Sequence, residues 1–145
     1  MKVEDLMTRE PLTIEPDAPV RTARDLMRDK GIRHLPVVDG TGRLLGILTD
    51  RDLEHAAFMP ALADHLGGPA HRLKAPRVRD VMTWSVVTTA PGATLAQAGL
   101  TIFERRIGCL PVVADGRLVG ILTDRDILKA LQKDRTDVDP DALPW

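Results

Sequence analysis

The sequence of 145 residues lacks features that mark several large classes of protein. Only 3% of its residues are aromatic, none is tyrosine, and 20 basic residues nearly balance 21 acidic ones. Proteins that bind nucleic acid usually present a basic surface and aromatic stacking platforms, so we expect no nucleic-acid partner. No apolar run approaches the roughly 18 residues of a membrane-spanning helix, and the first residues contain no signal-peptide core. We therefore expect a cytoplasmic protein without membrane contact.

Cysteine is almost absent. The single Cys109 cannot form an intrachain disulfide, and it lies among apolar residues, where we expect a packed thiol rather than a reactive one. No cysteine cluster accompanies the four scattered histidines, so no metal site is predicted. No nucleophile stands at a recognisable spacing from a base, and we expect no enzymatic activity.

A block of seven residues, Gly-Ile-Leu-Thr-Asp-Arg-Asp, occurs at Gly46–Asp52 and again at Gly120–Asp126. Two earlier segments are repeated as well: Val3–Thr8 resembles Val78–Thr83, and Leu35–Val38 recurs as Leu110–Val113. Such self-similarity indicates duplicated structural units. We therefore predict one repeat at 1–57, a connector at 58–77, a second repeat at 78–131 and a loose tail at 132–145.

Hydrophobic spacing in each repeat predicts the order strand, helix, strand, strand, helix. In the first repeat we expect an extended piece at 12–14, a helix with an apolar stripe from Val20 to Met27, a hairpin of 35–38 and 44–48, and a helix from Thr49. In the second we expect an extended piece at 87–89, a helix over 95–103, a hairpin with a type I′ turn at Asp115–Gly116, and a helix from Thr123.

Each repeat is too short to bury, by itself, a hydrophobic core large enough for a stable fold. We therefore expect an α/β fold, with an α+β-like order of elements, in which the two repeats pack around a pseudo-twofold axis. The connector contains Gly67, Gly68 and Pro69, so it is predicted to be a loop with at most one short helix near 61–66.

The repeated block forms a junction between a buried strand and a helix. Thr49 and Thr123 stand at the expected N-caps, and a carboxylate follows three residues later, at Asp52 and Asp126. Two roles are open for this pair. It can cap the helix as a capping box, or it can present a hydroxyl and a carboxylate to a bound molecule.

Three motifs occur in the same order in both repeats: Thr-x-x-Pro before the first helix, Leu-Pro-Val-Val after it, and Gly-Ile-Leu-Thr-x-x-Asp at the start of the last helix. This pattern resembles the cystathionine-β-synthase (CBS) domain family, and the tandem pair resembles the Bateman module of that family. The likeness covers 3–57 and 78–131. It implies a regulatory sensor that binds an adenosine-containing ligand, such as AMP, ADP, ATP or S-adenosylmethionine, in the clefts between repeats, and that commonly forms dimers.

The resemblance also implies roles for individual residues. Asp52 and Asp126 match ribose-binding carboxylates, since one carboxylate can accept hydrogen bonds from both hydroxyls of a diol. Arg51 and Arg125 adjoin them and can meet phosphates, although surface charges are the simpler interpretation. The full set of expected ligand-binding residues is Thr13, Ile14, Pro16, Arg33, His34, Pro36, Thr49, Arg51, Asp52, Thr88, Thr89, Pro91, Cys109, Pro111, Thr123, Arg125 and Asp126.

Two alternatives remain within this set. The segments with Pro16 and Pro91 match a base-binding region of the family, or they simply shape a turn. Arg33 and His34 in the first repeat correspond to Gly108 and Cys109 in the second, so the first site is expected to be more basic than the second.

These expectations combine into one functional prediction. The chain is expected to act as a regulatory module, without an attached catalytic domain, that binds an adenine nucleotide and signals to a separate protein as a homodimer. The alternatives are a ligand-free dimerisation scaffold and a module that binds S-adenosylmethionine.

Overall fold

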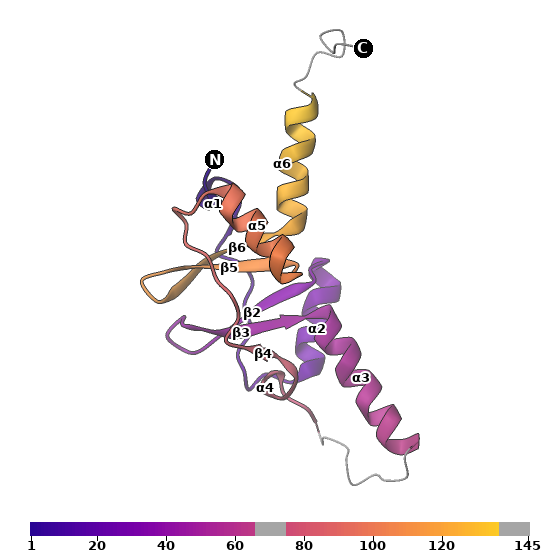
Figure 1. Cartoon of the computed structure of the whole chain (residues 1–145). Helices are drawn as coiled ribbons and strands as arrows, with labels where there is room; N and C mark the ends of the chain where they lie inside the picture. The colour runs from indigo at the N-terminus through magenta and orange to yellow at the C-terminus, as the bar shows by residue number, and fades with distance from the viewer. Residues whose placement is uncertain (66–74, 137–145) are drawn as a thin grey trace, which may run out of the picture. The chain divides into compact units, whose positions relative to one another are not determined.

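The computed structural model describes residues 1–65 and 75–136, which form two compact units (Figure 1). One unit, here called the α2 unit, comprises 11–65, 75–86 and 116–118 of the described residues. The other, the α5 unit, comprises 1–10, 87–115 and 119–136. Each unit contains one three-stranded antiparallel sheet and its own hydrophobic core.

The α2 unit has the sheet order β2-β3-β4. Its elements are α2 (Val20–Lys30), β2 (His34–Val38), β3 (Leu44–Thr49), α3 (Asp50–His65), α4 (Val78–Val81) and β4 (Thr83–Trp84). Strand β2 pairs with β3 so that His34 lies opposite Thr49 and Pro36 opposite Ile47. Helix α2 ends at Gly31, whose φ of 62° is the left-handed conformation typical of a helix C-cap.

The α5 unit has the sheet order β1-β6-β5. Its elements are α1 (Val3–Leu6), β1 (Thr8–Arg9), α5 (Leu95–Arg105), β5 (Cys109–Ala114), β6 (Arg117–Thr123) and α6 (Asp124–Thr136). Thr94 caps α5 by accepting a hydrogen bond from the backbone N–H of Gln97 at 3.1 Å. Asp115 and Gly116 have φ values of 52° and 76°, which confirms the predicted type I′ turn between β5 and β6.

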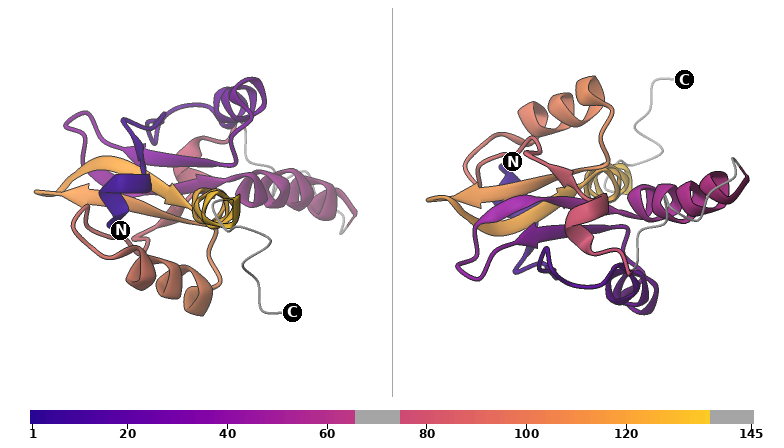
Figure 2. Two further views of the ribbon diagram at one scale, coloured as in Figure 1. Left: turned by 90° about the horizontal axis from the view of Figure 1, so that it is seen from above. Right: turned by 90° about the horizontal axis from the view of Figure 1, so that it is seen from below.

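The third strand of each sheet comes from the opening segment of the other repeat. Strand β1 pairs with β6, through Thr8 opposite Ile121, and β4 pairs with β3, through Thr83 opposite Ile47. Figure 2 shows the N-terminal segment beside the β5–β6 hairpin. Each compact unit therefore combines most of one sequence repeat with the first segment of the other.

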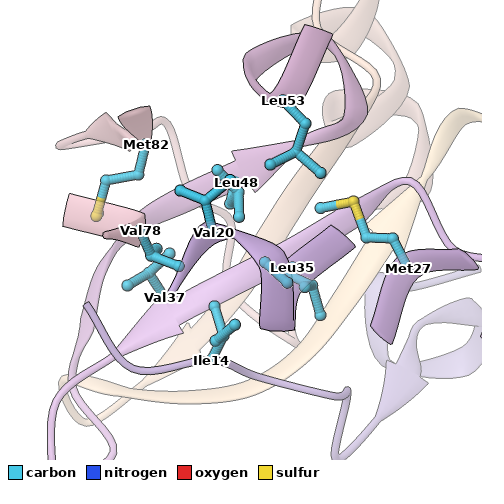
Figure 3. Packing of buried hydrophobic residues seen from close by; sticks show 10 residues of the cluster. Ile14, Val20, Met27, Leu35, Val37, Leu48, Leu53, Val78 and Met82 are labelled. Carbon is cyan, nitrogen blue, oxygen red and sulfur yellow. The ribbon is translucent and has the colours of Figure 1, made fainter. Parts of the chain in front are cut away.

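Both hydrophobic cores depend on these exchanged segments. In the α2 unit, Val78 and Met82 pack with nine-tenths or more of their surface buried among side chains from α2, β2, β3 and α3 (Figure 3). In the α5 unit, Val3 is fully buried with Ala98, Ile102 and Leu110. Full burial of a valine side chain contributes about 1.5–3 kcal/mol, so each segment is an integral part of the core it joins.

Two predictions about local structure were wrong in detail. The extended pieces at 12–14 and 87–89 are single bridges, Ile14 with Val37 and Thr89 with Val112, rather than strands. A short helix was expected near 61–66 of the connector; the structure has helix there as far as His65, but as a continuation of α3 that already includes 58–60 and passes through Pro60.

The end of the second repeat also differs from expectation. Helix α6 continues to Thr136, although the tail at 132–145 was predicted to be loose. The remainder of the predicted connector, 66–74, and of the predicted tail, 137–145, lies outside the described residues.

Candidate ligand site at two strand–helix junctions

In the α2 unit, Thr49 and Asp52 hold each other across the start of α3. The backbone N–H of Thr49 donates to Oδ2 of Asp52 at 2.9 Å, and the backbone N–H of Asp52 donates to Oγ1 of Thr49 at 3.2 Å. Both residues are half-buried. This reciprocal arrangement is a capping box, which fixes the two side chains relative to the backbone.

The α5 unit repeats this geometry at the start of α6. The N–H of Thr123 donates to Oδ2 of Asp126 at 2.9 Å, and the N–H of Asp126 donates to Oγ1 of Thr123 at 3.2 Å. The capping role considered from the sequence is therefore realised in both junctions. The two junctions are built alike although different residues surround them.

Capping leaves part of each pair available for a ligand. Oδ1 of Asp52 and Oδ1 of Asp126 accept no hydrogen bond from a described residue. Among the described residues, every buried side-chain oxygen has a hydrogen-bond partner, so these two Oδ1 atoms are exposed to solvent. The two threonine hydroxyls accept a hydrogen bond but donate none to a described residue. Each junction thus offers a fixed carboxylate oxygen as acceptor and a fixed hydroxyl as donor.

The first backbone N–H groups of the two helices are largely used within the chain. The N–H of Asp50 donates to the carbonyl of Arg33, and that of Asp124 to the carbonyl of Gly108, each at 3.0 Å. In α3 the N–H of Arg51 also donates to Oδ1 of Asp50 at 2.9 Å. Direct binding of an anion by these N–H groups would require breaking existing hydrogen bonds, so the side chains are the better candidates.

The segments before α2 and α5 run beside β2 and β5. The N–H of Ile14 donates to the carbonyl of Pro36, and the carbonyl of Ile14 accepts from Val38, each at 3.0 Å. Thr89 makes the same pair of bonds with Pro111 and Val113, at 3.0 and 2.9 Å. These two residues therefore have no backbone group left for a ligand.

The neighbouring threonines differ, because Thr13 and Thr88 are exposed and no hydrogen bond holds their side chains to a described residue. Ile14 bridges in parallel with Val37, so residues before Ile14 lie toward the His34 end of β2. Thr49 lies opposite His34 at that same end. Within the α2 unit, Thr13 and the Thr49–Asp52 pair are thus directed to one end of the sheet.

Pro16 and Pro91 have a structural task. Their carbonyls accept hydrogen bonds from the N–H groups of Arg79 and Glu4, at 2.9 and 3.0 Å, which attaches the exchanged segments α4 and α1. Pro36 and Pro111 are fully buried in β2 and β5. The sequence-based list therefore contains four prolines that organise the units, and their side chains are poor candidates for ligand contact.

The positions before Leu-Pro-Val-Val differ between the units, as the sequence indicated. His34 is half-buried, whereas Cys109 is buried with 7% of its surface exposed. Burial, with a further contribution from the nearby carboxylate of Asp124, raises the pKa of the Cys109 thiol to about 12. The predicted packed thiol is confirmed, and Cys109 has little surface for a ligand.

The two junctions differ in the number of arginines that stand next to them in sequence. Arg33 and Arg51 in the α2 unit are exposed and form no ion pair with a described side chain. In the α5 unit Arg125 is exposed in the same way, but Gly108 replaces Arg33. The α2 junction therefore offers two guanidinium groups to a phosphate and the α5 junction offers one.

Sequence reasoning missed Asp50 and Asp124, the first residues of α3 and α6. Their backbone N–H groups donate to the carbonyls of Arg33 and Gly108, which directly precede β2 and β5, and so attach each helix to its hairpin. The repeated block contained the signal, because both aspartates are part of it.

A comparison with protein-family models matches the CBS domain twice, at residues 3–58 and 78–133. The chain belongs to the CBS domain family. A CBS domain-containing protein of Dictyostelium discoideum is 33% identical over 139 residues, covering 95% of this chain and 96% of the relative. The inosine-5'-monophosphate dehydrogenase of Methanocaldococcus jannaschii is 35% identical over 129 residues, which are 88% of this chain but 23% of that enzyme.

Solved structures of CBS domain proteins have the same fold. A protein assigned to acetoin utilization (AcuB) in Vibrio cholerae is 36% identical with a TM-score of 0.78, covering 97% of this chain and 98% of that one. CBSX2 in complex with AMP is 29% identical with a TM-score of 0.77, covering 92% and 98%. The CBS domain pair of protein MJ0100, in complex with 5'-methylthioadenosine and S-adenosyl-L-methionine, is 27% identical with a TM-score of 0.77 and the same coverage.

Among the described residues of this CBS domain chain, no helix is both long and apolar enough to cross a membrane. Nor do three His, Cys, Asp or Glu side chains of residues 1–65 and 75–136 gather as a metal site would require.

Proposed function

We propose that this CBS domain pair binds an adenosine-containing ligand at its two strand–helix junctions and acts as a regulatory module. The observation that carries the proposal is the pair of capped carboxylates, each of which keeps Oδ1 available beside a threonine hydroxyl. A vicinal diol can donate both of its hydroxyl hydrogens to one carboxylate, and the threonine can donate to a ribose oxygen. The AMP bound by CBSX2 supports this class of ligand.

The proposed contacts form a smaller set than the sequence suggested. Asp52 and Asp126 accept from the ribose, Thr49 and Thr123 donate to it, and the exposed Thr13 and Thr88 extend toward the base. Arg33, Arg51 and Arg125 face phosphates when the ligand has them, and His34 completes the α2 junction. Because the α2 junction is the more basic, a ligand with several phosphates should prefer it to the α5 junction.

The proposal assigns no chemical step to the chain. Ligand occupancy changes the stability or packing of the module, and a separate protein responds to that change, while the module itself is a homodimer. The module is proposed to work in the cytoplasm, where adenine nucleotides are abundant.

A ligand-free scaffold is the second candidate function. It is favoured by the capping boxes, since both carboxylates already have a structural role that explains their presence in each repeat. Binding of S-adenosylmethionine is the third, supported by the ligands of the MJ0100 domain pair.

Thermal unfolding in the presence of AMP, ADP, ATP or S-adenosylmethionine separates these candidates. A ligand that binds only the folded state, present at a hundred times its dissociation constant, adds about 2.7 kcal/mol of stability. For a chain of this size that corresponds to a rise in Tm of roughly 5–10 °C. No rise with any of the four ligands at millimolar concentration would leave the scaffold.

A further inference from the structure

Helix α5 ends at an arginine whose backbone has a conformation that favours glycine. Arg106 has φ of 54° and ψ of 44°, in the left-handed region, and its backbone N–H donates to the carbonyls of Ile102 and Phe103. A residue with a side chain is strained in this conformation, so glycine is usual at such a helix end. The matched residue of the first repeat is Gly31, with φ of 62°. The second repeat thus has a strained residue where the same fold elsewhere uses glycine.

The end of the helix does not itself call for a second arginine. A cation near a helix C-terminus is favourable, but Arg105 in the last turn of α5 already supplies one, as the matched Lys30 does in α2. Arg106 is exposed and forms no ion pair with a described side chain. A strained residue without a structural contact is a candidate for a binding role.

The loop that begins at Arg106 is attached to the strand–helix junction of the α5 unit. The carbonyl of Gly108, two residues after Arg106, accepts a hydrogen bond from the N–H of Asp124 at 3.0 Å. Asp124 directly follows Thr123 and is two residues before Asp126. Two residues of chain span at most about 7 Å, a distance that an extended arginine side chain covers. The guanidinium of Arg106 can therefore reach a ligand held at this junction.

Arg106 also brings the two junctions to the same balance of charge. In each junction two aspartates of the repeated block stand at the start of the helix, and their carboxylates repel a phosphate. The α2 junction has Arg33 and Arg51 beside them. In the α5 junction Gly108 takes the place of Arg33, which leaves Arg125 alone. Arg106 stands two positions before this lost arginine and supplies the second guanidinium.

We propose that Arg106 is a phosphate-binding residue of the α5 junction, so that this junction selects adenosine ligands with a phosphate over adenosine itself and S-adenosylmethionine. The proposal rests on the proposed function and names the class of ligand at this junction. A guanidinium can donate two parallel hydrogen bonds to one phosphate. The α2 junction still has His34, whose counterpart Cys109 is buried, so a ligand with several phosphates continues to prefer the α2 junction.

The test follows backbone amide signals by NMR during titration with AMP and with adenosine, which differ only in the phosphate. Signals of Thr123 and Asp126 report the α5 junction, and those of Thr49 and Asp52 report the α2 junction in the same sample. In the parent, AMP should bind the α5 junction more tightly than adenosine does. Arg106→Gln removes the charge and retains a side chain on the left-handed backbone. It should weaken AMP binding at the α5 junction by about tenfold and leave adenosine binding unchanged.

Two further variants separate binding from backbone strain. Arg106→Gly should weaken AMP binding at the α5 junction to the same extent, and should also raise the melting temperature without ligand by roughly 2–5 °C because it relieves the strain. Arg105→Gln removes the neighbouring exposed charge and should leave both affinities at their parental values. In all three variants the signals of the α2 junction should respond as they do in the parent.

Parental AMP affinity at the α5 junction of Arg106→Gln, or an equal loss of AMP and adenosine binding, would overturn the assignment of Arg106. A parent whose α5 junction binds the two ligands equally would overturn it as well. If neither ligand shifts the signals of either junction, the proposed function fails together with this inference. A failure confined to Arg106 leaves the proposed ribose contacts of Asp52 and Asp126 intact.

Discussion

Gly46 lies directly against the carbonyl oxygen of Thr83, so that a Cβ at position 46 would overlap this oxygen and would also stand 2.6 Å from Cε of Met82. Gly46 pairs opposite Trp84 in the ladder that attaches β4 to β3. The absence of a side chain at Gly46 therefore permits the exchanged strand to join the sheet. Gly120 has the same role for β1, because a Cβ added at this position would stand only 2.9 Å from the carbonyl oxygen of Thr8.

Replacing Gly46 by alanine should destabilise the protein by about 3 kcal/mol, because the overlap is with backbone and no side-chain rotation relieves it. The free energy of unfolding from a urea titration measures this loss. Gly40→Ala is the control, since no atom of a described residue lies within 4 Å of a Cβ added there. Equal stability of the two variants would show that β4 is not held in this position.

An exposed ion pair makes a smaller contribution to the stability with which α4 and β4 are attached to the α2 unit. Nη2 and Nε of Arg79 contact Oδ1 of Asp17 at 2.6 and 2.9 Å, and the matched residues of the other unit, Glu4 and Gly92, have no such pair. Both side chains are about half exposed, so we expect Asp17→Asn to cost less than about 1 kcal/mol at low salt and almost nothing at 1 M salt. Urea titrations at the two salt concentrations measure the difference. A larger cost that persists at high salt would contradict this account.

Much of the fold could be predicted from residue patterns. The apolar spacing of Val20, Ala23 and Met27 indicated α2, and Asp115–Gly116 indicated the turn between β5 and β6; both are confirmed. The exchange of Val3–Thr8 and Val78–Thr83 could not be predicted in this way. Because the two segments are so similar, either one fits either core, and the sequence does not show which sheet each joins.

The candidate site, too, could be predicted only in part from the sequence. The repeated Thr and Asp residues were found from spacing, and the structure adds that the capping role leaves Oδ1 available. The task of Pro16 and Pro91 depends on hydrogen bonds to residues far away in the chain, Arg79 and Glu4, so no local pattern revealed it.

The buried thiol of Cys109 should be unreactive in the folded protein. Its pKa of about 12 means that almost no thiolate is present at pH 8, so an aromatic disulfide reagent should label it only after unfolding. The low reactivity results from burial of the thiol. The extent of labelling is measured by absorbance, once in the folded protein and once in urea. Rapid labelling of the folded protein would contradict the packed position.

The same pKa shift predicts a dependence of stability on pH. The pKa of the thiol in the folded protein is raised above the 9.0 of a free thiol, so the folded state retains a proton that the unfolded state loses. The contribution of the buried Cys109 thiol to the free energy of unfolding is complete below about pH 9 and is lost as pH rises toward about 12. The difference in unfolding free energy between the parent and Cys109→Ala should therefore shrink over this range, and a constant difference would argue against it.

The central claim is that Asp52 and Asp126 bind a ligand through the oxygen that capping leaves available. In Asp52→Asn and Asp126→Asn the amide oxygen can still accept the hydrogen bond from Thr49 or Thr123, so the melting temperature without ligand should change little. Loss of a charged acceptor contributes roughly 1.5–3 kcal/mol, so each variant should weaken adenine nucleotide binding at its own junction by about ten- to a hundredfold. Asp50→Asn is the matched control, since this exposed carboxylate lies in the same helical turn and, among the described residues, its Oδ1 accepts only from the backbone N–H of Arg51.

Isothermal titration of the parent and the three variants with AMP and ATP, beside their melting curves without ligand, is the most direct measurement. The account predicts weaker binding in Asp52→Asn and Asp126→Asn, parental affinity in Asp50→Asn, and similar melting temperatures in all four proteins. Parental affinity in both junction variants, together with a lower melting temperature without ligand, would contradict it and would leave these carboxylates as helix caps alone.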